Sequence, residues 1–262
     1  MVEAVKSDPA PNLLRLTNGI AIASGKGGVG KTWLSVTLCQ ILARQGRNVL
    51  LFDGDLGLAN VDIQLGLAPE KDLGGVLAGK YSLDQAISHC REGSFDVIAG
   101  RSGSGTLAGV PTQRLAQISA GLVKLSPKYD LVVLDLGAGV ERTVRQFAAM
   151  ARTCLIVTTD EPTAMTDAYA MIKLTRMNYP NADLRLVINM VQSKPDGERT
   201  YATLRKACQS FLKIAPPLAG IIKRDPKVRE AIQHQAPLLV RHPNATAALD
   251  VEAVARRMLQ SP

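Results

Sequence analysis

Cysteine is scarce in this chain, and its four copies are not spaced for a metal or redox site. Successive cysteines are 51, 64 and 54 positions apart, so there is no C-x-x-C pair of the kind that forms a zinc ribbon or a thioredoxin-like centre. Cys39 and Cys154 lie inside apolar runs, where a thiol behaves as a small buried hydrophobe. We therefore expect reduced, structural cysteines in a cytoplasmic protein.

Long apolar runs are also missing. No window approaches the roughly 18 consecutive apolar residues that a membrane-spanning helix requires, and residues 1–16 contain no apolar stretch of signal-peptide length. Aromatic residues make up only 4% of the chain, but its 46% hydrophobic and 21% charged residues are ordinary values for a globular protein. The sequence argues against secretion and against a membrane span.

Acidic residues are outnumbered by Lys and Arg, 23 to 31, which gives a net charge of +8. Residues 199–262 hold 11 basic and 4 acidic residues, whereas the preceding part of the chain is almost neutral. This last quarter is where an anionic partner would be sought. A solvated basic surface is the alternative interpretation.

Short aliphatic runs alternate with longer helical patterns along the chain. Several runs are apolar at every position, which is typical of strands in a parallel sheet that is covered on both faces. Residues 32–44 show the clearest helical spacing and are followed by Gly46. No linker or repeat interrupts the pattern, which predicts a single doubly wound, mostly parallel α/β sheet with helices on both faces over residues 17–262. A flexible segment is expected over residues 1–16 and a flexible loop over residues 100–109. The expected strands are Ile20–Ser24, Asn48–Asp53, Phe95–Ala99, Leu131–Asp135, Thr153–Thr158, Leu184–Asn189 and Leu218–Ile222.

Residues 20–32, which read IAIASGKGGVGKT, place a glycine loop between an apolar strand and the start of a helix. The segment matches G-x-x-x-x-G-K-[ST] in the strand–loop–helix context that this phosphate-binding motif needs. Glycines let successive backbone N–H groups turn toward phosphate oxygens, and the helix N-terminus adds positive charge. We expect Lys31 to contact the β- and γ-phosphates and the Thr32 hydroxyl to bind Mg²⁺. The other predicted phosphate contacts are Gly25, Lys26, Gly27, Gly28, Val29 and Gly30.

A lysine stands directly after the first glycine of the loop, at Lys26 in GKGGVGKT. In this feature the chain resembles the MinD/ParA group of P-loop ATPases, which have a deviant form of the loop. The resemblance implies a MinD-like P-loop NTPase fold, ATP and Mg²⁺ as cofactors, and a homodimer that encloses ATP between its subunits. It also implies that Lys26 and Lys31 are both catalytic, and that Lys26 reaches the phosphates bound by the other subunit.

Two aspartates, Asp53 and Asp55, end the run VLLFDGD. Ligands bind at the carboxyl ends of strands in open α/β sheets, and carboxylates near a lysine and Mg²⁺ stay ionised and can orient water. The segment resembles the first switch of MinD-type ATPases. That resemblance makes Asp55 the catalytic, water-positioning residue, assigns Asp53 to the Mg²⁺ site and includes Asn60 in the switch. An acidic turn that caps the next segment is the alternative.

A further aspartate, Asp135, ends the run YDLVVLD. An aspartate here suits an indirect contact with Mg²⁺, and Gly137 and Gly139 suit a second switch that senses the γ-phosphate. A strand-ending aspartate alone is a weak signal. Together with the two preceding motifs it supports an Mg²⁺-dependent ATPase.

Three residues are assigned to the remainder of the nucleotide. In related ATPases an asparagine at the position of Asn189 bonds to the adenine edge, and an amide suits this because it donates and accepts. Arg224 lies in a segment that resembles the loop that lies against the nucleotide base in MinD/ParA-type ATPases. The N-K-x-D motif of GTPases is absent, since the sequence reads NMVQ, so we expect ATP rather than GTP. Trp33 replaces a common threonine, so backbone contacts to phosphate persist while a side-chain contact is lost.

Longer segments, among them DGDLGLANVDIQLGL, DLGAGVERTV and TTDEPTAMTDAYAMIK, resemble the FlhG/FleN (YlxH) subgroup, which controls flagellar number and placement. The resemblance implies a slow, partner-stimulated ATPase that acts as a dimerisation switch, with an FlhF-like GTPase or flagellar proteins as partners. The subgroup's N-terminal D-Q-A-x-x-L-R element is reduced to Asp8–Leu13, where two prolines break a helix. Asp160 stands where the subgroup commonly has proline.

The end of the chain and its charge leave two alternatives open. Residues 247–259 form an apolar stripe at helical spacing; we expect a final helix packed on the body, and the alternative is a MinD-like helix at the inner face of the plasma membrane. The basic last quarter motivates a second function, a ParA-type ATPase that binds DNA nonspecifically with a steep salt dependence.

A nitrogenase-reductase-like protein would need a cluster cysteine near the second switch, and residues 125–150 contain none.

Overall fold

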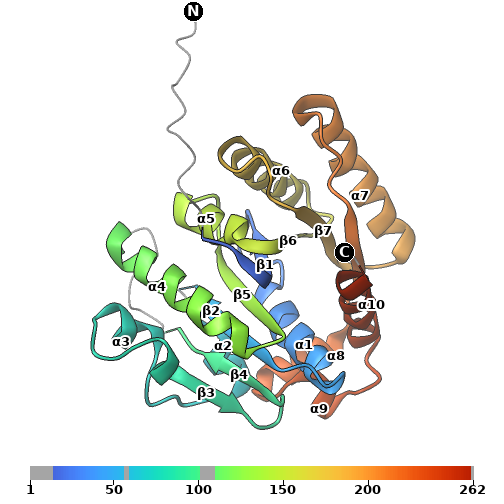
Figure 1. The fold of residues 1–262 in the computed structure, drawn as a ribbon. Helices are drawn as coiled ribbons and strands as arrows, with labels where there is room; N and C mark the ends of the chain where they lie inside the picture. The colour runs from blue at the N-terminus through green and yellow to red at the C-terminus, as the bar shows by residue number, and fades with distance from the viewer. Residues whose placement is uncertain (1–13, 56–58, 101–109, 261–262) are drawn as a thin grey trace, which may run out of the picture.

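The structure, a computed structural model, describes residues 14–55, 59–100 and 110–260. Within them one eight-stranded sheet has the order β3-β4-β2-β5-β1-β6-β7-β8 (Figure 1). Neighbouring strands are parallel except for β3, which lies antiparallel to β4 at one edge. The predicted mostly parallel sheet is confirmed. The strands are β1 (Leu16–Ser24), β2 (Val49–Gly54), β3 (Ile87–Cys90), β4 (Phe95–Ile98), β5 (Leu131–Ala138), β6 (Ala151–Thr158), β7 (Leu184–Val191) and β8 (Leu218–Lys223).

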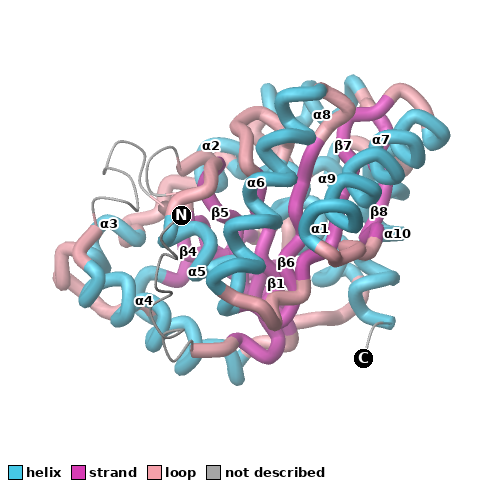
Figure 2. Tube along the Cα trace, turned by 90° about the horizontal axis from the view of Figure 1, so that it is seen from above, coloured by secondary structure: helices cyan, strands magenta, loops and turns pink. Residues whose placement is uncertain are grey.

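Helices cover both faces of the sheet, and Figure 2 shows the strands as an inner layer among them. Alternate residues of β1 enter different cores, with Ile20 and Ile22 in one and Ala21 and Ala23 in the other, because side chains of a strand alternate between its faces. Helices α1, α2 and α8–α10 contribute to the first core and α3–α7 to the second. The helices are α1 (Lys31–Arg44), α2 (Val61–Leu65), α3 (Leu73–Leu77), η1 (Asp84–Ala86), α4 (Thr112–Leu125), η3 (Ser126–Lys128), α5 (Arg142–Met150), α6 (Pro162–Asn178), α7 (Lys194–Ala207), η4 (Cys208–Leu212), α8 (Pro226–Gln233), α9 (Leu238–Arg241) and α10 (Thr246–Gln260).

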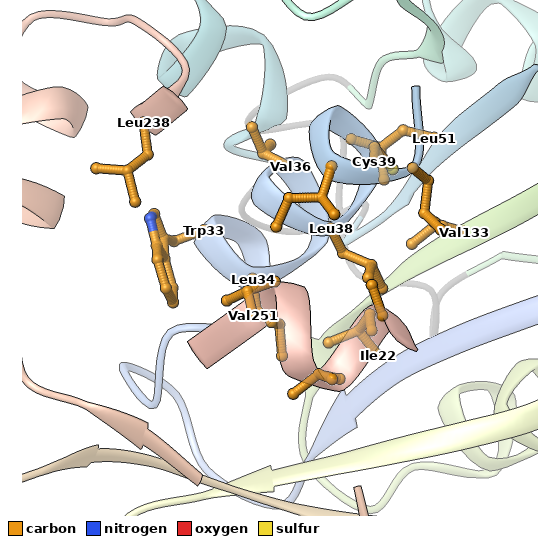
Figure 3. Close-up of a cluster of buried hydrophobic side chains, with 14 of the residues drawn as sticks. Ile22, Trp33, Leu34, Val36, Leu38, Cys39, Leu51, Val133, Leu238 and Val251 are labelled. Carbon is orange, nitrogen blue, oxygen red and sulfur yellow. The ribbon is translucent and has the colours of Figure 1, made fainter. Parts of the chain in front are cut away.

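Helix α1 is buried along almost its whole length, and it connects the glycine loop to the first core. Figure 3 shows that Trp33 lies on the side of α1 toward Leu238 of α9, while other α1 side chains extend toward the sheet. The helix ends at Gln45 and Gly46, and Gly46 has the left-handed φ of 79° that terminates many helices. The first helix and its glycine stop are as predicted from the sequence.

The predicted strands all exist, with ends that differ by a few residues. Strand β1 begins at Leu16, which is fully buried and pairs with Ala151, so the core starts one residue before the boundary expected at 16/17. Most of the expected N-terminal segment, residues 1–13, and most of the expected glycine-rich loop, residues 101–109, lie outside the described residues. Strand β3 was not predicted.

The final helix packs on the body of the protein. The apolar stripe of α10 is buried against β8 and α1, and Val251, Val254 and Ala255 are fully inaccessible to solvent. The packed helix expected from the sequence is therefore present. In the portion of the chain that the structure describes, no helix has both the length and the apolarity needed to cross a bilayer.

Candidate functional site

The predicted phosphate loop lies at the carboxyl end of β1, next to the end of β5, and β2 is the next strand beyond β5. Helix α1 follows β1 on one face of the sheet and α5 follows β5 on the other. The β1–α1 loop and the β5–α5 loop therefore run in opposite directions, and the crevice between them is where ligands bind in such folds. Gly28 and Gly30 have φ values of 78° and 90°, which side chains disfavour. The glycines thus give the loop the backbone shape that its motif predicted.

The loop is held from behind by α6 and by β7. A Cβ atom on Gly25 would lie 2.2 Å from the backbone oxygen of Asp167 in α6, so the two segments touch directly. From β7, the Asn189 side-chain amide donates to the Val29 carbonyl at 2.8 Å. These contacts fix the loop before any ligand binds.

Lys31, the motif lysine, is buried at the start of α1 with only 8% of its surface exposed. Its Nζ donates to Ser24 Oγ at 2.9 Å, and Ser24 Oγ donates to the Lys26 carbonyl at 2.6 Å. Burial lowers the pKa of Lys31, and the nearby carboxylates Asp135 and Asp55 partly oppose the shift. A buried cation at the mouth of a glycine loop is suited to bind an anion.

Asp53 and Asp135 are brought together by strand register, because they are paired neighbours on β2 and β5. Both side chains are almost completely buried. Burial raises the pKa of Asp53 to about 8, with the neighbouring Asp135 adding to the shift. Burial also raises the pKa of Asp135 to about 6, opposed by hydrogen bonds from Thr32 and Ser35, the latter at 2.9 Å.

The two predicted switches lie beside each other. A Cβ atom on Gly137 would be 3.4 Å from the Asp55 carboxylate, so the absence of a side chain at Gly137 leaves room for Asp55. Gly139 has a φ of 114° and donates its N–H to the Ser24 carbonyl at 2.9 Å. Asn60 is exposed and precedes α2, and its side chain makes no capping hydrogen bond there. The structure brings Asp55, Gly137 and Gly139 to the loop and leaves Asn60 at the surface.

Lys26 bonds to residues of its own chain at the start of α6. Its Nζ lies 2.8 Å from Glu161 Oε2 and 2.8 Å from Thr163 Oγ1, at the start of α6. The hydrogen bond from Lys26 is the largest cause of the lowered pKa of Glu161. The Lys26 side chain is 36% exposed and that of Glu161 62%, so this ion pair is accessible to solvent and weak.

A cavity of about 610 Å³ lies beside the loop, between α1, β7 and α8. Trp33 and Asn189 line it from one side and Arg224 and Ile232 from the other. The Asn189 amide is already used twice, since its oxygen accepts from the Met190 N–H at 2.9 Å while its nitrogen holds the loop. One donor hydrogen and one lone pair are left.

The cavity suits a nucleotide base and the loop suits its phosphates. Trp33, buried to 5% exposure, has an indole N–H with no hydrogen-bond partner among the described residues, which is a costly state for a buried donor. The buried pair Asp53 and Asp135 has raised pKa values, and a nearby cation would relieve both shifts. ATP with Mg²⁺ therefore fits the residues present, and Thr32, Asp53 and Asp135 would hold the metal.

Within the described residues, no group of three His, Cys, Asp or Glu side chains is arranged as a complete metal site. Mg²⁺ is commonly held by one or two protein ligands, with phosphates and water completing its shell.

Four residues of the site were not predicted from the sequence. Ser24 and Ser35 support Lys31 and Asp135 by hydrogen bonds, and Glu161 and Thr163 bind Lys26. The spacing of Ser35, one helical turn after Lys31, is a signal that could have been used. Glu161 and Thr163 offered no such signal, because their contact depends on how α6 packs on the loop.

Comparison with known proteins agrees with this geometry. Residues 20–238 match the model of the CobQ/CobB/MinD/ParA nucleotide binding domain. The chain is 37% identical to the antiactivator FleN of Pseudomonas aeruginosa over 239 residues, which cover 91% of this chain and 85% of FleN. It is 36% identical to the flagellum site-determining protein YlxH of Helicobacter pylori over 194 residues, covering 74% of this chain and 65% of YlxH.

Solved structures show the same fold. The septum site-determining protein MinD of Pyrococcus horikoshii, complexed with Mg-ADP, superposes with a TM-score of 0.77 at 26% identity and covers 93% of this chain and 96% of that one. MinD of Aquifex aeolicus, solved in a MinC:MinD complex, has a TM-score of 0.75 at 25% identity and covers 94% and 97%. The first of these structures contains Mg-ADP and the second contains the partner MinC.

Proposed function

The chain belongs to the CobQ/CobB/MinD/ParA nucleotide-binding family, and from that premise we propose that it is an ATP-dependent dimerisation switch that regulates flagellar number or polar placement. The observation that carries the ATPase part is the convergence of Lys31 with the strand-end carboxylates Asp53, Asp55 and Asp135 at the glycine loop. The similarity to FleN and YlxH supports the flagellar part.

The residues of the loop divide the work of ATP hydrolysis. Lys31 and the loop N–H groups hold the β- and γ-phosphates, and Thr32 would hold Mg²⁺, which would supply positive charge to neutralise the phosphates. Asp55 orients the water whose oxygen forms a bond to the γ-phosphorus, while the bond from that phosphorus to the bridging oxygen of ADP breaks. The two hydrogens of the water leave on the released phosphate. Asp135 positions Thr32 and accepts its hydroxyl proton in a hydrogen bond. The products are ADP and phosphate.

Lys26 links this chemistry to assembly. In the proposed dimer it leaves Glu161 and contacts the phosphates bound by the second subunit, so ATP is enclosed between two chains. Hydrolysis removes the γ-phosphate that both subunits hold, and the subunits separate. Partners that recognise only the dimer, such as an FlhF-like GTPase or flagellar proteins, would then sense which nucleotide is bound.

The test is the oligomeric state of variants with Mg-ATP and Mg-ADP, measured by light scattering. We expect Asp55→Ala to bind ATP and accumulate as a dimer, and Asp55→Ala combined with Lys26→Ala to remain monomeric with ATP bound. Asp62→Ala, on α2 outside the site, is the matched control. A chain that binds ATP and stays monomeric as Asp55→Ala would overturn the switch.

The flagellar role has its own test. In cells that lack the protein, the wild-type gene should restore the normal number and position of flagella, counted by electron microscopy, and the Lys31→Met gene should not. Restoration by Lys31→Met to the wild-type count would contradict a role for the ATP cycle in flagellar control.

A second candidate function is nonspecific DNA binding by the ATP dimer. In the described part of the chain, six exposed cations of the basic last quarter make no ion pair: Arg205, Lys206, Lys213, Arg224, Lys227 and Arg229. DNA binding through such cations falls steeply as salt rises, because it releases counterions. A DNA gel-shift assay at low and moderate salt tests this candidate function, and the absence of any ATP-dependent shift at either salt concentration rejects it.

A further inference from the structure

A second cavity, of about 410 Å³, lies between α4 and the segment that leads from α3 to η1. It is lined by none of the residues of the ATP site. Its apolar lining comes from both walls: Val76, Leu77, Leu83, Ile118 and Leu125. The volume is in the range of pockets that bind small molecules.

The cavity is an elongated slot that follows one face of α4. Its lining residues on this helix recur at intervals of three and four, from Arg114 through Gly121 to Lys124, which places them on a single stripe. At a rise of 1.5 Å per residue, Arg114 and Lys124 are about 15 Å apart along the helix. A Cβ atom on Gly121 would lie 3.2 Å from Leu83, so the two walls approach each other closely at the middle of the slot and a larger residue than glycine would narrow it further.

The wall opposite α4 is held in place by hydrogen bonds. The Tyr81 hydroxyl accepts from the Asp72 N–H at 2.8 Å and donates to the Asp72 carbonyl at 3.0 Å. A Cβ atom on Gly75 would meet this hydroxyl at 2.0 Å, so the ring is closely enclosed. The slot is therefore formed without a ligand.

Each end of the slot carries a net positive charge. Arg114 stands at one end, where it donates to Gln117 Oε1 at 3.0 Å. Lys124 and Lys128 stand at the other end with one carboxylate, Asp84, which gives that end two positive charges and one negative. Among the described residues, no carboxylate lies within ion-pair distance of any of these three cations.

We propose that this slot is a second ligand site, which binds an elongated small molecule with an apolar body and an anionic group at each end. The guanidinium of Arg114 binds a carboxylate or phosphate with two parallel hydrogen bonds, and the lysines at the far end bind the second anion. The apolar walls bury the body of the molecule. The site is separate from the ATP site, because none of its lining residues belongs to the phosphate loop.

The test uses two acids of equal chain length, decanedioate and decanoate, titrated by calorimetry into the full-length protein with Mg-ADP present to occupy the phosphate loop. We expect the wild type to bind decanedioate about tenfold more tightly than decanoate. Arg114→Met should lower the affinity for decanedioate to about that for decanoate. The double variant Lys124→Met and Lys128→Met should do the same from the other end.

Matched controls separate this site from general charge effects. Lys173→Met on α6 and Arg205→Met on α7 change exposed cations of other helices and should keep the tenfold preference. Unchanged affinity for ADP verifies that each variant is folded. Equal binding of the two acids by the wild type, no binding of either, or an unchanged preference in the slot variants would each overturn the proposal.

Discussion

Asp53 and Asp135 are buried carboxylates on neighbouring strands. When no cation is bound, burying two carboxylates side by side costs free energy. The structure shows this as raised pKa values for both residues, caused first by burial. Protonation relieves the cost, and so does a bound cation. The stability of the nucleotide-free protein should therefore depend on pH in a definite direction.

We expect the unfolding free energy of the nucleotide-free protein to fall as pH rises from 5 to 8. The pKa of Asp53 is about 8 in the folded chain and near 3.8 in the unfolded chain. Over most of this range Asp53 is therefore ionised in the unfolded state and protonated in the folded state. Raising the pH favours the ionised, unfolded state, so the stability present at low pH is lost. The loss from Asp53 is at most about 4 kcal/mol, which corresponds to roughly three pH units. Urea unfolding of the wild type and of Asp53→Asn at both pH values measures this loss of unfolding free energy. An equal loss in both proteins would show that Asp53 does not cause it.

The pair between Lys26 and Glu161 competes with any contact that Lys26 makes to a second subunit. Glu161→Gln weakens this pair, so we expect the ATP concentration at half-maximal dimerisation to fall, by about two- to fivefold, because an exposed ion pair is weak and competes only modestly. Light scattering during an ATP titration measures this. Glu198→Gln on α7, which weakens the exposed pair with Lys194, should leave the midpoint unchanged; an equal shift in both variants would exclude the competition.

Single residues of the site were predictable where one contiguous motif contains them. Lys31 and Thr32 follow from the loop pattern alone, and in the structure Lys31 bonds to Ser24 and Thr32 to Asp135. Glu161 lies 135 positions from Lys26, and nothing local specifies that contact. The Asn189 amide was predicted to face adenine, and no local pattern indicated that it also holds the Val29 carbonyl.

At the scale of elements, the contact between the glycine loop and α6 is the tightest of the site. A methyl group on Gly25 would lie 2.2 Å from a backbone oxygen of α6, whereas on Gly27 its nearest neighbour would be 4.0 Å away. We expect Gly25→Ala to lower the unfolding free energy by about 1–3 kcal/mol, as overpacking does, and to weaken ADP binding. Gly27→Ala should stay within about 0.5 kcal/mol of wild type. Denaturant unfolding and calorimetry measure both effects; similar losses in the two variants would contradict this packing.

Buried strands were predictable and the edge strand was not. The inner strands are apolar at almost every position, because helices cover both faces. Strand β3 has the sequence ISHC, with exposed and polar positions and only four residues, so no periodicity identifies it. Its antiparallel pairing with β4 is a tertiary property that depends on the short turn between them.

For the whole molecule, the nucleotide completes a site that is otherwise electrostatically strained. We expect Mg-ADP at one hundred times its dissociation constant to add about 2.7 kcal/mol of stability. For a chain of this size, that raises the melting temperature by about 5–10 °C. Lys31→Met should show a much smaller shift at the same concentration, measured by scanning calorimetry. A full shift in this variant would mean that Lys31 does not hold the phosphates.

All four cysteines are buried and unpaired by disulfides, and burial raises the pKa of each thiol. Thiol reagents attack the ionised form, so the folded chain offers them almost nothing to modify. The native cysteines therefore do not need to be replaced before the protein is labelled. A single cysteine introduced on the surface would carry a fluorophore or spin label alone, and the two labels of a dimer would report the distance between subunits through each nucleotide cycle.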